Sequence, residues 1–302
     1  MTDSSDAVPV TGLRRLLPGT NVLLTAFIVL TAVASVILYL LPGHTATLFS
    51  WTIQPSITGT FLGSGYAAGL VLVVLSIRSR IWAYARLPLI TITVFAALTL
   101  VATLLHLDRF HFSAPMASAS FAAWVWLAVY IAVPGGLVLQ VWRQHRLPGA
   151  DPVRRRSWPP LMTVILGTQG GVLASAGIAL FVAPASTGWW PWALTPLTAQ
   201  MIGSWLIAFG TAAALALADL DVGRLRIASV GYAFFALLQV VALARFSDQV
   251  RWMAVGTGVY VILLLSILAI GSAGSVLSAR EPKTAVGHDS QPAVRSGSRW
   301  TS

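Results

Sequence analysis

The sequence contains no cysteine among its 302 residues. Disulfides, thiolate nucleophiles, cysteine-ligated zinc, iron–sulfur clusters and lipid anchors on cysteine are therefore excluded together. Charge is the second shortage, because only 9% of the residues are charged, against roughly 25% in soluble domains. With 57% hydrophobic residues and a mean hydropathy of +0.80, the composition excludes an ordinary soluble domain and predicts an integral membrane protein.

Negative charge is also scarce, since nine acidic residues stand against nineteen basic ones and give a formal net charge of +10. A nucleic-acid-binding protein would gather its basic residues on one soluble face or helix. Here they are spread between apolar runs. We therefore expect no nucleic acid among the partners, and we expect membrane lipids instead.

The long apolar runs are what the sequence has in abundance. A helix needs about 18 to 25 apolar residues to cross a hydrocarbon core roughly 30 Å thick. Eight runs meet this requirement, which predicts an all-α integral membrane protein: Asn21–Leu41, Thr60–Ile77, Leu87–Leu107, Ser120–Val141, Leu161–Val182, Ala199–Ala218, Ile227–Ala244 and Trp252–Ile270.

The loops between these runs alternate sharply in positive charge. One set of loops and tails holds sixteen Arg and Lys residues, and the opposite set holds only Arg109, Arg245 and Arg251. Positively charged loops are retained on the cytoplasmic side. The sequence therefore predicts that both termini are cytoplasmic and that the protein lies in a bacterial cytoplasmic membrane.

Composition also divides the chain. Two polar tails, 1–20 and 278–302, are expected to be disordered because they have little to bury. The segment 143–160 is rich in Pro and Arg and predicts a cytoplasmic linker between two four-helix halves, 21–142 and 161–277.

The two halves carry similar segments about 140 residues apart. Trp51 to Thr58, followed by Gly63-Ser64, resembles Trp192 to Thr198, followed by Gly203-Ser204. Fixed-offset similarity of this kind indicates an internal repeat. Further matches pair Pro42 with Pro184, Arg86 with Arg226, Arg109-Phe110 with Arg245-Phe246, and Tyr130 with Tyr260.

Four crossings in each half mean that both halves enter from the same side. They are then tandem repeats related by a parallel pseudo-twofold axis along the membrane normal. This places the two interruptions, Pro42 to Gly59 and Pro184 to Thr198, on the same outer face. Because indole rings are favourable at the head-group level, Trp51 and Trp192 suggest interfacial or shallow re-entrant segments.

Two short segments resemble a family of bacterial polytopic membrane proteins, frequent in actinobacteria. The segments are Trp192 to Thr198, with the pattern Trp-x-Leu-Thr-Pro-Leu-Thr, and His106 to Phe110, with the pattern His-x-Asp-Arg-Phe. The resemblance covers most of the helical part. It implies a multi-pass membrane fold and brings no catalytic residue, because no activity is established for that family.

No apolar run has an ionisable residue near its middle, which disfavours a pump driven by a midplane carboxylate. The densest polar groups lie at the outer ends of the third and seventh runs. An anionic head group or small carboxylate could be clamped there by arginine. Intramolecular Asp–Arg anchors are the alternative reading of these residues: His106, Asp108, Arg109, His111, Arg245, Asp248 and Arg251.

Two glutamines within the apolar runs, Gln169 and Gln239, are candidates for lining a polar path. Alternatively, their amides only form hydrogen bonds between packed helices. His106 and His111 lie five residues apart, about 140° around one helix, so they do not form a metal pair. A haem between His106 and His44 is an alternative that nothing in the sequence requires. We assign no metal, cofactor or catalytic residue.

Three function classes follow from these observations. The first is a permease-like protein, or one that handles a lipid or small molecule at the outer face. The second is a non-catalytic accessory subunit of a larger membrane complex, with other membrane subunits as partners. An enzyme acting on a lipid head group is the third. A polar cavity between the halves would favour transport, and a tightly filled centre would favour the accessory role.

Overall fold

The structure is a computed structural model that describes residues 12–154 and 156–280. Over this part of the chain it contains nine α-helices, and its only β-pairing is in isolated bridges. Eight of the helices are long and apolar enough to cross a bilayer, which confirms the sequence prediction of a multi-pass α-helical membrane protein. Most of the two tails that the sequence assigns to disorder lies outside the described residues.

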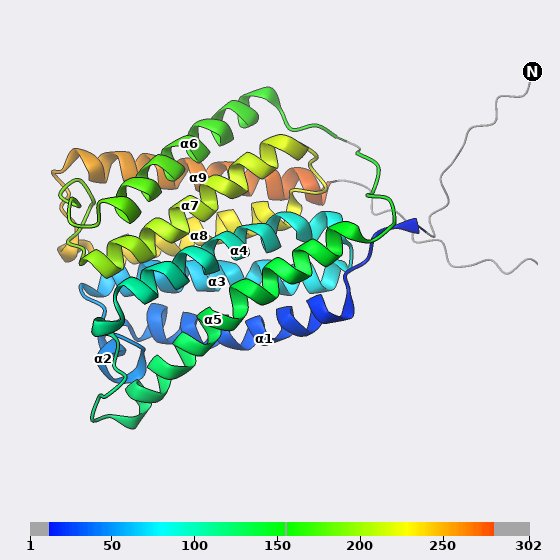
Figure 1. The fold of residues 1–302 in the computed structure, drawn as a ribbon. Coiled ribbons are helices and arrows are strands. Elements are labelled where there is room, and N and C mark those ends of the chain that lie inside the picture. The colour runs from blue at the N-terminus through cyan, green and yellow to red at the C-terminus, as the bar shows by residue number, and fades with distance from the viewer. Residues whose placement is uncertain (1–11, 155, 281–302) are drawn as a thin grey trace, which may run out of the picture.

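The spans follow one another with short connections (Figure 1). The first four are α1 (Pro18–Ser35, continued by the π-helix η2, Val36–Leu40), α3 (Ser56–Ser79), α4 (Trp82–Leu105) and α5 (Ala117–Arg146). The last four are α6 (Pro160–Val182), α7 (Pro196–Asp219), α8 (Arg226–Arg245) and α9 (Val255–Ala279). Short helices lie between them: η3 (Pro42–His44), α2 (Thr45–Leu48), η4 (Leu107–Arg109) and η5 (Ser247–Gln249).

Successive spans alternate in direction, so α1 begins and α9 ends at the same end of the bundle (Figure 1). We call this the termini end and the opposite one the far end. The last span differs most from its predicted bounds of Trp252 to Ile270. A turn in which Ala254 N–H donates to the Arg251 carbonyl at 3.0 Å delays its start to Val255. Small and apolar residues then continue the helix to Ala279.

The two halves do not form separate bundles. Helices α3, α4, α7 and α8 make the inner group, and α1, α5, α6 and α9 lie outside them. Each inner helix packs on an inner helix of the other half, α3 on α8 and α4 on α7. The segments 21–142 and 161–277 therefore share one core.

Glycine lets α6 and α7 approach at backbone distance. A Cβ on Gly177 would lie 2.7 Å from the Ile207 nitrogen and 2.9 Å from the Gly203 oxygen. A Cβ on Gly203 would in turn lie 2.8 Å from the Gly177 oxygen. Small residues at such crossings are the usual means of close helix packing in membranes. As a result, α6 and α7 form the tightest helix pair of the fold.

Several local features occur twice, about 140 residues apart. The segment before α1 pairs with the segment before α4, and the segment before α6 pairs with the segment before α8; the two antiparallel bridges are Arg15–Ile81 and Ser157–Asp221. Arg80 precedes Ile81 in the first bridge, and Leu220 precedes Asp221 in the second. Both have a left-handed backbone conformation although neither is glycine, with φ of 55° at Arg80 and 47° at Leu220.

Two of the sequence matches do not fit these positions. The short helices η4 and η5 begin at Leu107 and Ser247, an offset of 140 residues, which sets Arg109 opposite Gln249 instead of Arg245. Helices α5 and α9 begin 138 residues apart, at Ala117 and Val255, so Tyr130 and Tyr260 are not equivalent either. The Arg-Phe and Tyr matches therefore have offsets of 136 and 130 residues, which differ from the offsets of the helix starts.

Candidate functional site

His106 ends α4 at the far end, and its side chain is held by α7. Its Nε2 lies 2.9 Å from Gln200 Oε1, and Gln200 Nε2 donates to the Phe181 carbonyl at 2.9 Å. Gln200 is buried, and His106 is half-buried. The histidine therefore joins α4 to the start of α7 and to the end of α6.

His111 has both ring nitrogens engaged. Nδ1 lies 3.0 Å from the Phe49 carbonyl, and Nε2 lies 3.1 Å from Thr52 Oγ1. A carbonyl only accepts, so Nδ1 carries the proton and Nε2 accepts from the threonine hydroxyl. His111 thus fastens the loop before α3 to the loop after η4. Within residues 12–154 and 156–280, no three His, Cys, Asp or Glu side chains come together as a metal site.

Asp108 and Arg109 pair with each other at the surface. Arg109 Nε lies 3.0 Å from Asp108 Oδ2, and the two side chains are 70% and 69% exposed. Asp248, in η5, is also exposed. Exposed pairs of this kind contribute little to stability. Asp108 and Arg109 therefore form the intramolecular anchor that was the alternative reading of these residues.

Arg245 caps the irregular end of the first span. It donates from Nη1 to the Tyr39 carbonyl at 2.8 Å and from Nη2 to the Leu40 carbonyl at 3.3 Å, the last carbonyls of η2. Its guanidinium also lies 4.9 Å from the Phe246 ring. No hydrogen bond or ion pair in the described part of the chain joins Arg245 to His106 or Arg109.

Arg251 holds the loop between α6 and α7. Its Nη2 donates to the Trp190 carbonyl and, at 3.4 Å, to the Trp192 carbonyl, and its backbone N–H donates to the Pro191 carbonyl at 2.8 Å. The other two guanidinium nitrogens, Nε and Nη1, have no hydrogen bond to a residue in the described part of the chain. Arg251 therefore keeps donors available at the far end.

The two tryptophans of the predicted interfacial segments are not at a lipid surface. Trp51 is 2% exposed and Trp192 is fully buried. Trp192 Nε1 donates to Thr58 Oγ1 at 2.9 Å, and Trp51 packs edge-on against Trp126 at 4.9 Å. The protein surrounds these irregular segments because lipid offers no hydrogen bonds to their backbone. Both rings support the far-end loops and do not face a ligand there.

Gln169 and Gln239 each join three helices. Gln169 Nε2 donates to Ser266 Oγ at 2.9 Å, and its Oε1 accepts from the Tyr232 hydroxyl at 3.3 Å. Gln239 donates to the Phe61 carbonyl at 3.3 Å and accepts from the Tyr260 hydroxyl at 2.8 Å. Both amides are buried, and neither lines either of the two cavities described below.

A cavity of about 180 Å³ lies between α6 and α9 at the far end. Its wall is almost entirely apolar and includes Phe61, Leu206, Phe235 and Leu264. The loop residues Trp189 to Pro191, between α6 and α7, also line it. Val172, Trp189 and Val259 on its rim are 39%, 42% and 52% exposed, so it opens on the lipid-facing surface. We call it the far-end cavity.

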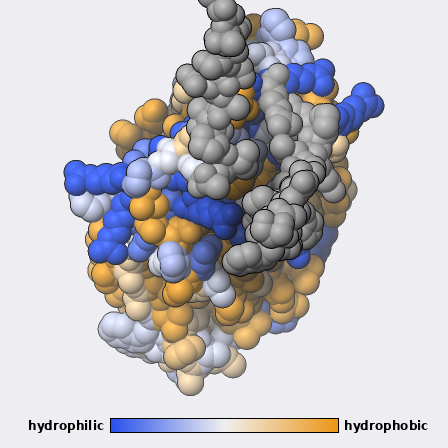
Figure 2. Space-filling view, turned by 90° about the vertical axis from the view of Figure 1, so that its right-hand side faces the viewer, coloured by the Kyte–Doolittle hydropathy of each residue, from blue (hydrophilic) through white to orange (hydrophobic). Residues whose placement is uncertain are grey.

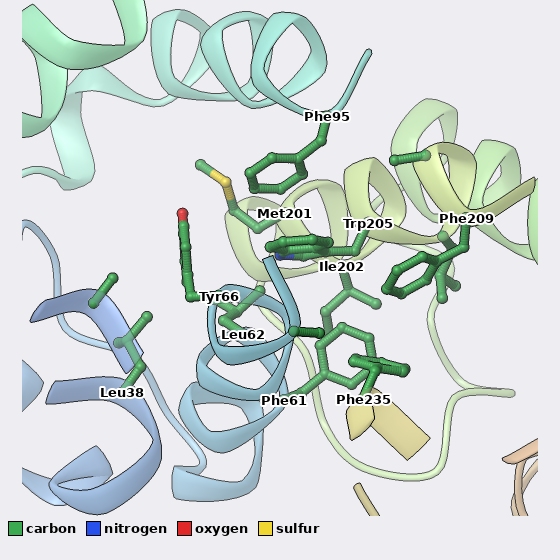
Figure 3. Close-up of a cluster of buried hydrophobic side chains, with 14 of the residues drawn as sticks. Leu38, Phe61, Leu62, Tyr66, Phe95, Met201, Ile202, Trp205, Phe209 and Phe235 are labelled. Atoms are coloured by element: carbon green, nitrogen blue, oxygen red, sulfur yellow. The ribbon is translucent and has the colours of Figure 1, made fainter. Parts of the chain in front are cut away.

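A second cavity, of about 80 Å³, lies between the inner helices and extends toward the termini end. Glycine and alanine from α3, α7 and α8 provide much of its wall, with Trp158 near the termini end and Trp205 at the other. The Trp205 ring stacks on Phe95 at 3.8 Å (Figure 3). We call it the central cavity. It is apolar, so it is not the polar path that would favour transport of a hydrophilic solute.

An ion-paired layer lies at the termini end, and the sequence predicts only its Asp219–Arg224 part, as a neutralised cluster where the sixth apolar run ends. Asp219 accepts from Arg86 at 2.8 Å, from Arg224 at 3.0 Å and from Arg154 at 3.1 Å, and Arg86 also reaches Asp151 at 3.2 Å. Asp219 and Arg224 are 10% and 9% exposed. This layer connects α4, the end of α7, the loop before α8 and the linker. The charges were visible as loop residues, but nothing in their spacing brings Arg86 to Asp219.

Exposed arginines surround this layer. Figure 2 looks at the termini end and shows hydrophilic side chains collected there among apolar ones. The exposed members are Arg15, Arg78, Arg80, Arg143, Arg146, Arg154, Arg156, Arg226 and Arg280.

Comparison with known protein families, with curated proteins and with solved structures finds no match. The resemblance of the Trp192 to Thr198 and His106 to Phe110 segments to a bacterial membrane-protein family therefore stays a prediction.

Proposed function

We propose that the protein binds a membrane lipid, with a hydrocarbon chain of that lipid in the far-end cavity. The observation that carries this proposal is the cavity itself, which is apolar and opens between α6 and α9 toward the lipid-facing surface. Ligand sites are typically concave and mostly apolar with a few polar groups. A lipid chain enters such a crevice sideways, directly from the bilayer.

Arg251 supplies the polar end of this site. It anchors Trp190 and Pro191, which line the cavity, so its guanidinium lies beside the cavity wall. Arginine binds phosphate and carboxylate through two parallel N–H donors. We therefore expect an anionic head group, with Arg251 as the residue of the predicted outer-face set that contacts it.

We further propose that the chain is a tandem duplication with a parallel pseudo-twofold axis and that both termini are cytoplasmic. The repeated bridges and the left-handed Arg80 and Leu220 support the first point. The exposed arginines at the termini end support the second, since positive charge is retained in the cytoplasm. The far-end cavity then opens toward the outer leaflet of a bacterial cytoplasmic membrane.

Substitution Leu264→Trp tests lipid binding. Leu264 is 2% exposed and lines the cavity, so an indole there occupies the space of the lipid chain. The position 138 residues earlier on α5 already carries Trp126, which packs on Tyr130 at 4.4 Å, so this helix geometry accommodates the larger ring. We expect the affinity for phosphatidylglycerol to fall about tenfold, equivalent to about 1.4 kcal/mol.

Native mass spectrometry of the protein titrated with phosphatidylglycerol measures this loss. The matched control is Leu265→Trp, because Leu265 is 52% exposed on the neighbouring lipid-facing position and does not line the cavity. Equal lipid retention by both variants would contradict the far-end site. A retained protein subunit in place of lipid would support the accessory-subunit class instead.

The orientation is tested with single cysteines, since the chain has none of its own. Gly188 lies in the exposed far-end loop, and Val153 is 84% exposed in the linker at the termini end. In intact cells we expect a membrane-impermeant maleimide to label Gly188→Cys and to leave Val153→Cys unlabelled until the membrane is permeabilised. The reverse pattern would show that the termini are outside.

A further inference from the structure

The second half of the chain consists of two tight helix pairs with little contact between them. Helix α6 packs on α7, and α8 packs on α9, where a Cβ on Gly271 would lie 2.6 Å from the Ala233 nitrogen. By contrast, the backbones of α6 and α9 touch only lightly, and those of α7 and α8 stay apart, so that α7 meets α8 through side chains such as the rings of Phe209 and Phe235. Both cavities lie in the seam where the pairs α6–α7 and α8–α9 face each other, and α3 and α4 form the remaining wall of the central cavity.

The two cavities approach each other on all four helices. The nearest wall residues are three residues apart on α8 and α9, which is about 4.5 Å along a helix. With the far-end cavity first, they are Phe235 and Tyr232 on α8 and Ile267 and Ile270 on α9; on α6 they are Val172 and Leu166, and on α7 the two walls meet at the consecutive residues Leu206 and Trp205.

A thin layer of side chains separates the cavities where they approach each other. Gln169 lies between Leu166 and Leu173 on α6 and crosses the seam to Ser266 on α9 and Tyr232 on α8. Beside it, the Phe209 and Phe235 rings lie 4.7 Å apart and are tilted by 54° (Figure 3). Interhelical bonds of this kind in membranes are weak. The bonds of this layer therefore contribute little to holding the two helix pairs together.

Each cavity also has one buried donor without an acceptor. Trp190 lines the far-end cavity and is 3% exposed, and Trp158 lines the central cavity and is 6% exposed. Neither indole Nε1 has a hydrogen-bond partner in the described part of the chain. Unsatisfied buried donors are unusual and call for an explanation. An ester carbonyl of a lipid would satisfy either one.

We propose that the two cavities are successive parts of one lipid path and that the protein moves an acyl lipid between the leaflets along the seam. The inference rests on the proposed lipid binding and extends it to translocation. On α9 the cavity walls run from Gly256 to Gly271, about 22 Å of a hydrocarbon core roughly 30 Å thick. The Gln169–Ser266–Tyr232 layer is the step that limits passage.

Proteoliposomes test this activity directly. The vesicles contain phosphatidylethanolamine and phosphatidylglycerol with a trace of phosphatidylglycerol carrying an NBD-labelled acyl chain, and dithionite added outside reduces only the outer-leaflet label. With wild-type protein we expect the loss to proceed beyond the outer-leaflet fraction seen without protein. Gln169→Leu keeps the side-chain volume but removes two interhelical bonds, so its rate should rise about three- to tenfold.

Blocking the path gives the opposite result. Ala212 lines the central cavity, whereas Ala214 on the same helix is exposed to lipid. We expect Ala212→Phe to reduce the rate to the protein-free level and Ala214→Phe to leave it unchanged. Size-exclusion profiles and phosphatidylglycerol retention in native mass spectra establish that each variant is folded and still binds lipid.

The outcomes separate the two proposals. Wild-type protein that retains phosphatidylglycerol but moves no label overturns the translocation path and leaves lipid binding intact. Equal rates for Ala212→Phe and Ala214→Phe also overturn the path. If the wild-type protein does not retain the lipid, or if Leu264→Trp retains as much lipid as the wild type, the proposed lipid binding fails, and the path fails with it.

Discussion

Replacing Asp219 with Asn should lower the free energy of unfolding by about 3–5 kcal/mol, the range for breaking a buried ion pair on one side. Asp219 is the shared acceptor of Arg86, Arg154 and Arg224, and it is only 10% exposed. The amide removes the negative charge and leaves the Arg224 guanidinium, 9% exposed, without its closest counter-ion. Unfolding in detergent followed by intrinsic fluorescence along an SDS titration measures the change.

The matched control is Asp108→Asn at the other end of the molecule. Its pair with Arg109 is also an Asp–Arg contact of 3.0 Å, but both partners are about 70% exposed. Exposed pairs contribute roughly 0 to 1 kcal/mol, so this variant should unfold like the wild type. If Asp219→Asn were no more destabilised than Asp108→Asn, the buried layer would not hold α4, α7 and the linker together.

The eight spans could be read from the sequence because the bilayer sets their length. Each crossing requires about 20 apolar residues, and the loops between them carry the charge. Irregular ends were harder to place. The π-helix at Val36–Leu40 belongs to the first apolar run, yet its geometry depends on contacts that come late in the chain, since Arg245 caps Tyr39 and Leu40.

The polar residues could be found but not interpreted. His106 and His111 stand close together in the sequence, but their partners are Gln200 in one case and Phe49 and Thr52 in the other. These contacts depend on how α4 packs on α7 and how the loop before α3 folds back. Periodicity along one helix contains no information about which helix lies opposite.

The cavities were beyond the sequence for a different reason. A wall of Leu, Phe and Trp has the same composition as a filled core, and only packing decides whether space remains. The first half has Trp126 where α9 has Leu264, an offset of 138 residues, and Trp126 fills its side by packing on Phe49 and Trp51. Leu264, by contrast, leaves space on its side, where it lines the far-end cavity.

The second large loss of stability is expected when Trp192 is replaced, because this side chain is fully buried beneath the far-end loop. Its ring packs on Trp190 at 5.3 Å and on Tyr260 at 5.6 Å, and its N–H donates to Thr58 on α3. We expect Trp192→Ala to lower the free energy of unfolding by about 3–5 kcal/mol, the range for removing a large buried aromatic side chain. The same SDS titration measures it.

Trp189→Ala is the control, since Trp189 belongs to the same loop but is 42% exposed, and its variant should lose far less stability. Trp192→Phe should lie between the two, because it keeps most of the ring and loses the bond to Thr58. Head-group anchoring of both indoles by lipid would instead make Trp189→Ala the more damaging change. A larger effect at Trp192 means that the Trp189 to Pro191 wall of the far-end cavity is positioned from inside the protein.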